Sequence, residues 1–402
     1  MNDRPAVLGG EPVFPTRVPF ERPTLPPFAS MESDLADIFA SGMLTKGKHL
    51  ADFEERLAAH LGVRHAVGLS SCTVGLLLVY RTLGLTGEVI VPSFTFMATV
   101  HPLLWNNLTP VFADVDPLTW NLDPDAAEAA ITPRTSAIVG VHVFGNPAPV
   151  ERLQEIANRR GLTLIIDAAH AFGSLRRGQP VGRFGAAEVF STSPTKPLVT
   201  GEGGIITTND DALARLLRLG REYGNQGDYD SIFPGLNARM QEFCALLGLR
   251  TLDTLEENVL ARNRLVDRYR QRLEALPGIA FQQIDPADRC SYKDLTVMVD
   301  EAAFGLSRDA LARALLAEGV DTRRYYDPPV HRHTLYQDIW RRQPAPDRRP
   351  GAGALPVTDT LASRTLSLPM YAHLGADVVD GICRAIERIH AHAEEVRELP
   401  SA

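Results

Sequence analysis

The sequence predicts an α/β protein, in which a large domain carries a mostly parallel mixed sheet sandwiched by helices and a smaller C-terminal α+β domain follows. Three observations predict this architecture. Between residues 64 and 208, short apolar runs of strand length alternate with helical stretches, as in parallel sheets. The 402 residues are too many for one small core. Residues 279–402 mix strands and helices and indicate a second, smaller unit.

The elements of the large domain are expected in the following order. Seven prolines in residues 1–28 predict an irregular N-terminal arm. Helices are expected at 31–41 and at 50–61, where Phe53, Leu57 and Leu61 share one face. Apolar runs predict strands at 66–69, 88–92, 110–114, 137–142, 163–167, 187–191 and 204–208. Between the strands, helices are expected at 74–82, 95–106, 124–130 and 150–160.

The second half of the chain is expected to begin with a helix at 210–221 and a polar, glycine-containing segment at 222–235. A long helix at 238–276, ended by Pro277-Gly278, would then link the two domains. We therefore predict three parts: an arm at 1–28, a large domain at 29–250, and a linking helix with a small domain at 251–402. The arginine- and proline-rich residues 341–353 predict a surface loop.

Composition disfavours several classes of function. A net charge of −8 and a pI near 5.8 argue against a nucleic-acid groove or binding to an anionic membrane. No apolar run approaches the roughly 20 residues that span a bilayer, and the polar N-terminus does not resemble a secretory signal. Four cysteines without CxxC spacing predict a reducing, cytoplasmic setting. We also expect no metal site, since no ligand spacing supports one.

Lysine is rare in this chain, and one lysine follows a predicted strand. Of 41 basic residues only Lys46, Lys48, Lys196 and Lys293 are lysine. Lys196 comes after the strand that ends at Ser191 and before the glycines of Gly201-Glu-Gly-Gly204. A lysine in an enclosed site loses its proton readily and forms a Schiff base with a carbonyl cofactor. Taken alone, the segment also fits a surface loop.

An acid and a phosphate-binding turn accompany this lysine. Asp167 ends a buried apolar strand, where it needs a cation such as a pyridinium, although it could instead cap the next helix. His170 lies one turn further on and could bond the cofactor's ring oxygen or serve as a core histidine. Ser71, Cys72 and Thr73 stand between a strand and a helix, which suits a phosphate or simple capping. Together the three segments favour pyridoxal phosphate.

The chain resembles the DegT/DnrJ/EryC1/StrS family of pyridoxal-phosphate-dependent sugar aminotransferases of fold type I. The resemblance is carried by Val91-Pro-Ser-Phe-Thr-Phe96, Asp167-Ala-Ala-His170-Ala, Ser191 with Lys196, Gly201-Glu-Gly-Gly204 and Gly235-Leu-Asn237. It covers residues 41–277 clearly and extends more loosely to 370. Cys72 departs from the Gly or Ala that the family usually has before its phosphate-binding threonine, which is harmless if only its N–H is used.

The resemblance implies a role for each matching residue. Lys196 would hold the cofactor as an internal aldimine and move the proton, and Asp167 would keep the pyridine nitrogen protonated. His170 would lie near the ring hydroxyl and Phe96 would stack on the ring. The phosphate would meet Cys72 N–H, Thr73 and Ser191, together with Asn237 of a neighbouring subunit. A homodimer with shared active sites is therefore expected. A polar and aromatic cluster in the C-terminal part consists of Arg323, Tyr325, Tyr326, His331 and His333, and within it Arg323, Tyr325 and His331 are candidate substrate contacts.

The function that the resemblance implies is amino transfer from L-glutamate or glutamine to a ketosugar, most simply a nucleotide-linked 4-keto-6-deoxyhexose, by a ping-pong mechanism. An aminocyclitol aminotransferase acting on an inosose is an alternative, as is a sugar dehydratase that uses pyridoxal or pyridoxamine phosphate. One dehydratase branch has histidine in place of the lysine, so Lys196 disfavours it. A non-catalytic regulatory relative would have no need for Lys196, Asp167 and Thr73 together.

Overall fold

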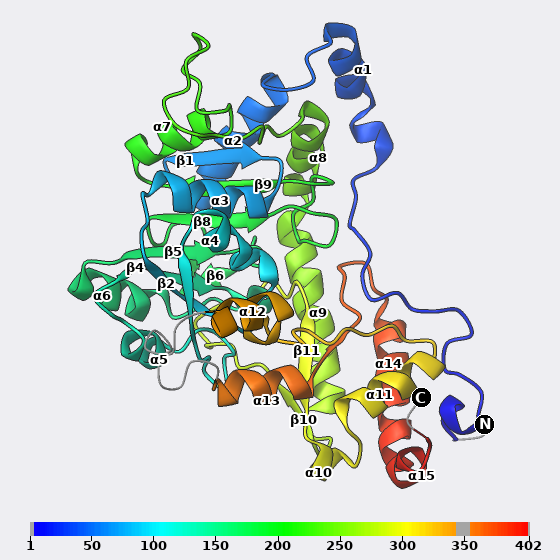
Figure 1. Cartoon of the computed structure of the whole chain (residues 1–402). Coiled ribbons are helices and arrows are strands. Elements are labelled where there is room, and N and C mark those ends of the chain that lie inside the picture. Colours follow the sequence, from blue (N-terminus) through cyan, green and yellow to red (C-terminus); the bar gives the residue numbers. More distant parts are fainter. Residues whose placement is uncertain (1–3, 343–353, 401–402) are drawn as a thin grey trace.

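The structure is a computed structural model that describes residues 4–342 and 354–400, and a seven-stranded sheet forms the centre of its large domain (Figure 1). The strands lie in the order β1-β9-β8-β5-β4-β2-β3. Their bounds are β1 His65–Leu69, β2 Glu88–Pro92, β3 Thr109–Ala113, β4 Thr135–Val141, β5 Thr163–Asp167, β8 Ala187–Ser191 and β9 Gly204–Thr208. All seven lie within two residues of the predicted runs at both ends.

The sheet is parallel except at one strand. Pairs β2–β3, β2–β4, β4–β5 and β5–β8 are parallel, whereas β9 runs antiparallel to both β1 and β8. The predicted mostly parallel mixed sheet is therefore confirmed. Because β9 is antiparallel to its neighbours, its first residue lies beside the last residues of β1 and β8, at the carboxyl ends of those strands.

Helices cover both faces of the sheet, and the alternation of side chains along each strand explains how. Ile138 and Ile166 belong to one apolar cluster, while Val139 and Ile165 belong to the cluster on the opposite face. The first cluster includes residues of α2 (Lys48–Leu61), α5 (Pro124–Ala129), α6 (Val150–Arg160) and α8 (Glu242–Asp253). The second includes residues of α3 (Cys72–Thr82), α4 (His101–Trp105) and α7 (Asp211–Gly220). Burial on both faces explains why the strands are mostly apolar.

A smaller α+β unit follows, and this part of the prediction is also confirmed. Its antiparallel sheet has the order β10 (Ile279–Phe281), β11 (Leu295–Val299), β12 (Thr365–Leu368). Its core joins this sheet to α9 (Leu255–Leu273), α11 (Arg308–Ala317) and α14 (Ala376–Ala391). The remaining helices of the unit are α10 (Glu301–Phe304), α12 (Thr334–Arg342), α13 (Pro356–Arg364) and α15 (Ala393–Arg397).

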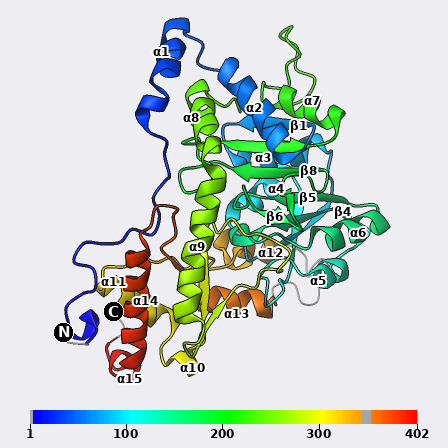
Figure 2. The same cartoon turned by 180° about the vertical axis from the view of Figure 1, so that it is seen from behind.

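The predicted long helix at 238–276 is wrong in one respect, because it is two helices. Helix α8 ends at Asp253 and α9 begins at Leu255, and Figure 2 shows them end to end along the molecule. Thr254 between them has non-helical angles (φ −109°, ψ 4°). Its hydroxyl donates to the carbonyl of Thr251, a local bond that competes with the helix. No glycine or proline marks this break in the sequence.

The predicted helix at 95–106 is also wrong. The structure has a 3-10 turn at Met97–Thr99 and the short helix α4 instead. Pro102 lacks an N–H and fits only the first turn of a helix, so the helix begins at His101. Of the predicted loop at 341–353, residues 341 and 342 belong to the end of α12, and the rest lies outside the described residues.

The N-terminal segment follows the small unit before it reaches the sheet (Figure 1). Val18 forms a parallel bridge with Val320, and the N–H of Phe14 donates to the carbonyl of Glu318 at 3.1 Å. The segment then continues into α1 (Glu32–Ser41), where Arg250 of α8 pairs with Asp34. Residues near the start of the chain thereby contact both units.

Helix α2 is capped by a side chain from far along the sequence. The buried carboxylate of Glu242 accepts hydrogen bonds from the N–H groups of Gly47, His49 and Leu50 at 2.9, 2.8 and 3.2 Å. A negative charge at the N-terminus of a helix also interacts favourably with the helix dipole. Glu242 therefore ties the start of α2 to the start of α8.

Candidate active site

Three turns in which the sequence predicts functional residues lie together at the carboxyl ends of β1, β5 and β8. Leu69 at the end of β1 and Ser191 at the end of β8 both pair with Gly204, the first residue of β9. A Cβ on Gly204 would lie 2.4 Å from the backbone carbonyl carbon of Ser71, so only glycine permits this approach. Asp167 ends β5, which runs parallel to β8 beside it.

A cavity of about 350 Å³ opens at these strand ends and brings most of the predicted site residues together. The predicted residues that line it are Ser71, Cys72, Thr73, Phe96, Asp167, His170, Ser191, Lys196 and Tyr325. They come from the ends of three strands, from the turn before α4 and from the segment after α11. Phe96 is 49% exposed, so the cavity is open on its side.

The N-terminus of α3 forms one wall of this cavity. Ser71 is the N-cap residue, and its Oγ accepts from the N–H of Val74 at 3.2 Å. The N–H groups of Cys72 and Thr73 belong to the first turn, where an α-helix leaves its amides without intrahelical partners. Burial raises the pKa of the Cys72 thiol well above its usual value, so this side chain stays neutral. The wall therefore offers backbone donors and a helix dipole to an anion.

Asp167 is a buried carboxylate to which none of the cations among the described residues is bonded. Its Oδ2 accepts from the hydroxyl of Thr99 at 2.7 Å, and its Oδ1 accepts from the N–H of Ala169 at 3.0 Å. Burial raises the pKa of Asp167, and these two hydrogen bonds only partly oppose that effect. Thr99 is in turn bonded to Thr95 at 2.8 Å, which fixes the hydroxyl that orients the carboxylate. A cation in the cavity would offset the cost of this burial.

His170 presents a neutral ring to the cavity. Its Nδ1 accepts from the N–H of Phe144 at 3.2 Å, so in the neutral ring the hydrogen is on Nε2. Burial, followed by the charges of Lys196 and Lys293, holds the pKa of His170 well below its usual value. The ring lies parallel to that of Phe144, with centroids 6.2 Å apart. His170 is therefore a fixed hydrogen-bond donor through Nε2–H.

Lys196 lies in the loop that connects β8 to β9. A bond of 2.6 Å between the hydroxyls of Thr192 and Thr200 closes this loop. Within residues 4–342 and 354–400, Nζ of Lys196 forms no hydrogen bond or ion pair. Burial, and next the charge of Lys293, lower the pKa of Lys196 to about 8. Roughly one amine in ten is then neutral at pH 7.

Some cavity residues escaped the sequence-based prediction of the site. Thr99, Glu202, Lys293, Asp294 and Tyr326 line the cavity as well. Lysine scarcity was a signal for Lys293, and the cluster around Tyr325 was a signal for Tyr326. The sequence carries no signal for Thr99, because a threonine in a predicted helix is common. Nor does it indicate that the segment before β11 reaches the cavity.

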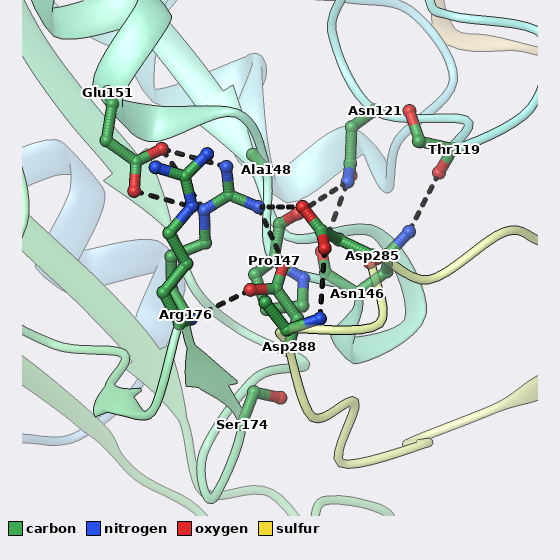
Figure 3. Close-up of polar contacts among 12 residues, drawn as sticks. Thr119, Asn121, Asn146, Pro147, Ala148, Glu151, Ser174, Arg176, Asp285 and Asp288 are labelled. Atoms are coloured by element: carbon green, nitrogen blue, oxygen red, sulfur yellow. Dashed lines mark hydrogen bonds and ion pairs between the residues drawn. The ribbon is translucent and has the colours of Figure 1, made fainter.

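That segment is fixed to the turn, helix and loop that follow β4 and β5 by a network of polar contacts (Figure 3). Arg176 donates to Glu151 at 2.9 Å and to Asp288 at 2.6 Å, and it lies 3.7 Å from Asp285. The side-chain amide of Asn146 donates to the carbonyl of Gln283 at 2.9 Å. Residues 283–294 therefore bring Lys293 and Asp294 to the cavity on a segment with defined contacts.

Three predicted residues lie outside the cavity lining. Asn237 is exposed, and the carbonyl of its neighbour Ala238 accepts from the N–H of Ser70 at 2.9 Å, so Asn237 flanks the turn before α3. Arg323 is exposed and lies over the ring of Phe20. In a single chain, therefore, neither residue reaches the lining of the cavity where its predicted role would place it.

His331, the third, is fully buried and cannot touch a substrate in this arrangement. Its Nδ1 lies 2.7 Å from Oγ of Ser93, and its Nε2 lies 3.2 Å from Asp359. Ser93 is fully buried too, so this serine–histidine–aspartate group joins the end of β2 to the start of α13 rather than facing a ligand. The structure thus gives His331 a packing role and no place in the cavity.

The residues present fit pyridoxal phosphate. The first turn of α3 suits the phosphate, Asp167 suits a protonated ring nitrogen, and the neutral share of Lys196 suits an aldehyde. No helix in the described part of the chain has the length and apolar character to cross a membrane. Within the same residues, no group of three or more His, Cys, Asp or Glu is placed to hold a metal ion. The fold and the cavity together are those of a pyridoxal-phosphate-dependent enzyme of fold type I.

Comparisons with known proteins narrow this class to one family. The chain belongs to the DegT/DnrJ/EryC1/StrS aminotransferase family, whose model matches residues 29–387. It is 33% identical to the spore coat polysaccharide biosynthesis protein SpsC of Bacillus subtilis (89% of this chain, 93% of the relative). It is 32% identical to dTDP-4-amino-4,6-dideoxy-D-glucose transaminase of Escherichia coli (92% and 98%).

Solved structures agree with this assignment. The crystal structure of DesI in the presence of its TDP-sugar product superposes with a TM-score of 0.89 at 40% identity, covering 99% of this chain and 98% of that one. S. venezuelae DesV superposes with a TM-score of 0.83 at 34% identity, covering 94% and 99%. The protein is therefore a pyridoxal-phosphate-dependent aminotransferase of a family whose named relatives act in sugar metabolism.

Proposed function

We propose that the enzyme transfers an amino group from L-glutamate, or L-glutamine, to a nucleotide-linked 4-keto-6-deoxyhexose by a ping-pong mechanism. The observation that carries the proposal is the cavity itself, in which Lys196, with its lowered pKa, and the buried Asp167 lie beside the first turn of α3. When bound, pyridoxal phosphate supplies an aldehyde that takes up the amino group and a ring that accepts the electrons of the donor's Cα–H bond.

Lys196 is the residue proposed to move protons. Lys196 lines the cavity, and its lowered pKa would let its Nζ take a proton from the donor's Cα and deliver it to the carbon that was the cofactor's aldehyde. The same group serves both half-reactions, because it regains its starting protonation after each one. A lysine exposed to water would be almost entirely protonated at pH 7 and a poor base.

Asp167, His170 and α3 are proposed to bind and orient the cofactor. The carboxylate of Asp167 would hold a proton on the ring nitrogen, and Nε2–H of His170 would donate to the ring oxygen. The N–H groups of Cys72 and Thr73, with the hydroxyls of Thr73 and Ser191, would hold the phosphate. Phe96 would stack on the ring, and its exposed side would be covered by the substrate or a second subunit.

Relatives support the choice of a nucleotide sugar. The Escherichia coli relative is named for a dTDP-4-amino-4,6-dideoxyhexose, and the DesI structure was determined with a TDP-sugar product. A Streptomyces venezuelae relative, 34% identical over 90% of this chain and 93% of its own, is named for a dTDP-3-amino sugar instead. We propose amination at carbon 4 and use the 3-keto isomer as the competing substrate in the test.

We also propose that the enzyme works as a homodimer with shared active sites in the cytoplasm. Large apolar side chains are exposed in the single chain, among them Phe39 (75%) and Trp105 (77%), and a second copy would cover them. Asn237 would reach the phosphate of the partner's cofactor. The four free cysteines agree with a reducing compartment.

The test begins with the absorption spectrum of the purified enzyme loaded with pyridoxal phosphate. L-Glutamate should convert the visible band of the bound cofactor to the near-ultraviolet band of its amine form, and dTDP-4-keto-6-deoxyglucose should then restore the first band and yield an amino sugar detectable by mass spectrometry. Lys196→Ala should fold and show neither change. A loaded enzyme that reacts with neither L-glutamate nor L-glutamine, or an aminated product formed only from the 3-keto isomer, would contradict the proposal.

A further inference from the structure

The cavity contains a second buried lysine that the proposed mechanism does not use. Lys293 lies just before β11, is 4% exposed and lines the same cavity as Lys196. Its Nζ is paired with Glu21 from the N-terminal segment and with Oδ1 of Asp294 at 2.8 Å. Among the described residues that line the cavity, Lys293 is the only cation besides Lys196. In a chain with four lysines, two therefore share one buried site.

The position of this charge is fixed by the backbone as well as by its partners. The N–H of Lys293 donates to the carbonyl of Phe144 at 3.1 Å, in the turn that follows β4. Arg262 of α9 donates to the carbonyls of Tyr292 and Lys293 at 3.0 and 3.3 Å. The network of Arg176 holds the preceding residues (Figure 3). Lys293 thus has a defined place beside the cavity, unlike a surface lysine on a flexible stem.

The groups around Lys196 act on it with opposite signs. Lys293 is the like charge that faces it from the small unit, and Asp294 on the same segment carries the opposite charge. Asp167 at the end of β5 faces it with a negative charge, the thiol of Cys72 at the start of α3 stays neutral, and Glu202 lies on the same loop as Lys196. A nearby positive charge favours the neutral amine, and a negative charge favours the ammonium.

We propose that Lys293 is a positioning residue for amino transfer, because its fixed positive charge, held by Glu21 and Asp294, raises the share of Lys196 in the neutral form that reacts. The inference rests on the proposed function of Lys196. The lowered pKa of Lys196 agrees with it, since the charge of Lys293 is the largest contribution after burial. The competing interpretation is that Lys293 only anchors the N-terminal segment through Glu21.

The scarcity of lysine makes a direct measurement practical. In apoprotein labelled with [ε-13C]lysine, carbon NMR should show four ε-carbon signals, and the one missing from Lys196→Arg identifies Lys196. A pH titration of that signal then reports the pKa of Lys196 without cofactor or turnover. Lys293→Met should raise this pKa by about one unit or more, and Asp294→Asn should lower it. Lys293→Arg, which keeps the charge, should leave it within about 0.3 units.

Controls separate this effect from a structural one. Lys48→Met makes the same change on an exposed lysine outside the cavity lining and should leave the pKa of Lys196 unchanged. If Lys293→Met alone does not fold, Lys293→Met with Glu21→Gln removes the buried carboxylate left without a partner, and the rise should remain. Unchanged values in both Lys293→Met and Asp294→Asn, or shifts in the same direction, would overturn the inference.

The test is also independent of the proposed function. Opposite shifts in apoprotein whose loaded form does not react with any amino donor would uphold the role of Lys293 and reject the proposed reaction. Amino transfer by the wild type, with the pKa of Lys196 unaffected by Lys293→Met, would uphold the proposed reaction and reject the role of Lys293. In an active enzyme, the acid limb of the pH profile of kcat/KM should move in the same direction as the pKa in each variant.

Discussion

Mixing two inactive variants tests whether the active sites are shared between subunits. Asn237 is exposed and lies outside the cavity of its own chain, beside the turn before α3. Asn237→Asp would bring a carboxylate toward the cofactor's phosphate, and Lys196→Ala removes the reacting amine. Each variant alone should therefore be nearly inactive, the first through repulsion between two anions and the second through loss of the amine.

The expected recovery follows from the geometry of a two-site dimer. If each site combines Lys196 of one subunit with Asn237 of the other, a heterodimer of the two variants has one intact site and one site with both changes. Random reassortment of equal amounts makes half of the dimers heterodimers. The mixture should therefore regain about a quarter of the wild-type activity, measured as L-glutamate-dependent amination after mild dissociation and dilution.

The opposite arrangement gives a different result. If Asn237 serves the site of its own chain, every site in the mixture carries one change and no activity returns. An unmixed sample of each variant treated in the same way is the control for recovery caused by refolding alone. Failure to exceed these controls, with heterodimers demonstrated by differently tagged chains, would refute the shared site.

Three other changes test single features. Asp167→Asn should slow the L-glutamate half-reaction about a hundredfold or more, since breaking a buried charge pair costs about 3–5 kcal/mol; a loss below threefold in stopped-flow absorbance would discredit the pairing. Uptake of pyridoxal phosphate by the apoprotein should accelerate about tenfold per pH unit and level off above pH 8, because Lys196 reacts as a neutral amine with a pKa of about 8; a rise continuing to pH 10 would mean an ordinary, exposed amine. Glu242→Ala should lower the free energy of unfolding by about 3 kcal/mol, since three amides of α2 lose their acceptor; a urea midpoint shift worth less than about 1 kcal/mol would contradict this.

The sheet could be predicted well because each strand is recognisable from its own residues. Runs such as Val89–Val91 are apolar on both faces and bounded by charge or proline, and Gly204 marks a close approach that a side chain would block. Helix ends were predicted less well. The start of α4 follows from Pro102, which fits only the first turn of a helix, whereas the break at Thr254 comes from a local hydroxyl bond that a threonine in a charged helix does not reveal.

The residues of the candidate site could be predicted where they stand at the end of a strand. They could not be predicted where a distant segment of the chain brings them to the cavity. Lys196 and Asp167 each follow a recognisable strand, so their order in the chain indicated one cavity. Lys293 reaches that cavity through contacts with residues more than a hundred positions away, such as Phe144. His331 is the opposite case. Its place in a polar cluster of the sequence suggested a substrate contact, but the structure buries it against Ser93.

The pairing of β1 with β9 has a consequence for how the chain is made. After β1 leaves the ribosome, about 140 residues must be synthesised before Gly204–Thr208 can pair with it. At roughly 5–20 residues per second, the strand waits on the order of 10–30 s with both of its edges unpaired. The central strands β2, β4 and β5 are translated during that wait. All of their partners in the sheet have been made once β8 has been translated. Synthesis therefore favours a sheet that assembles from its middle, and the cofactor cavity, which also needs Lys293 and Tyr326, closes only after Tyr326 has been synthesised, more than a hundred residues after β9.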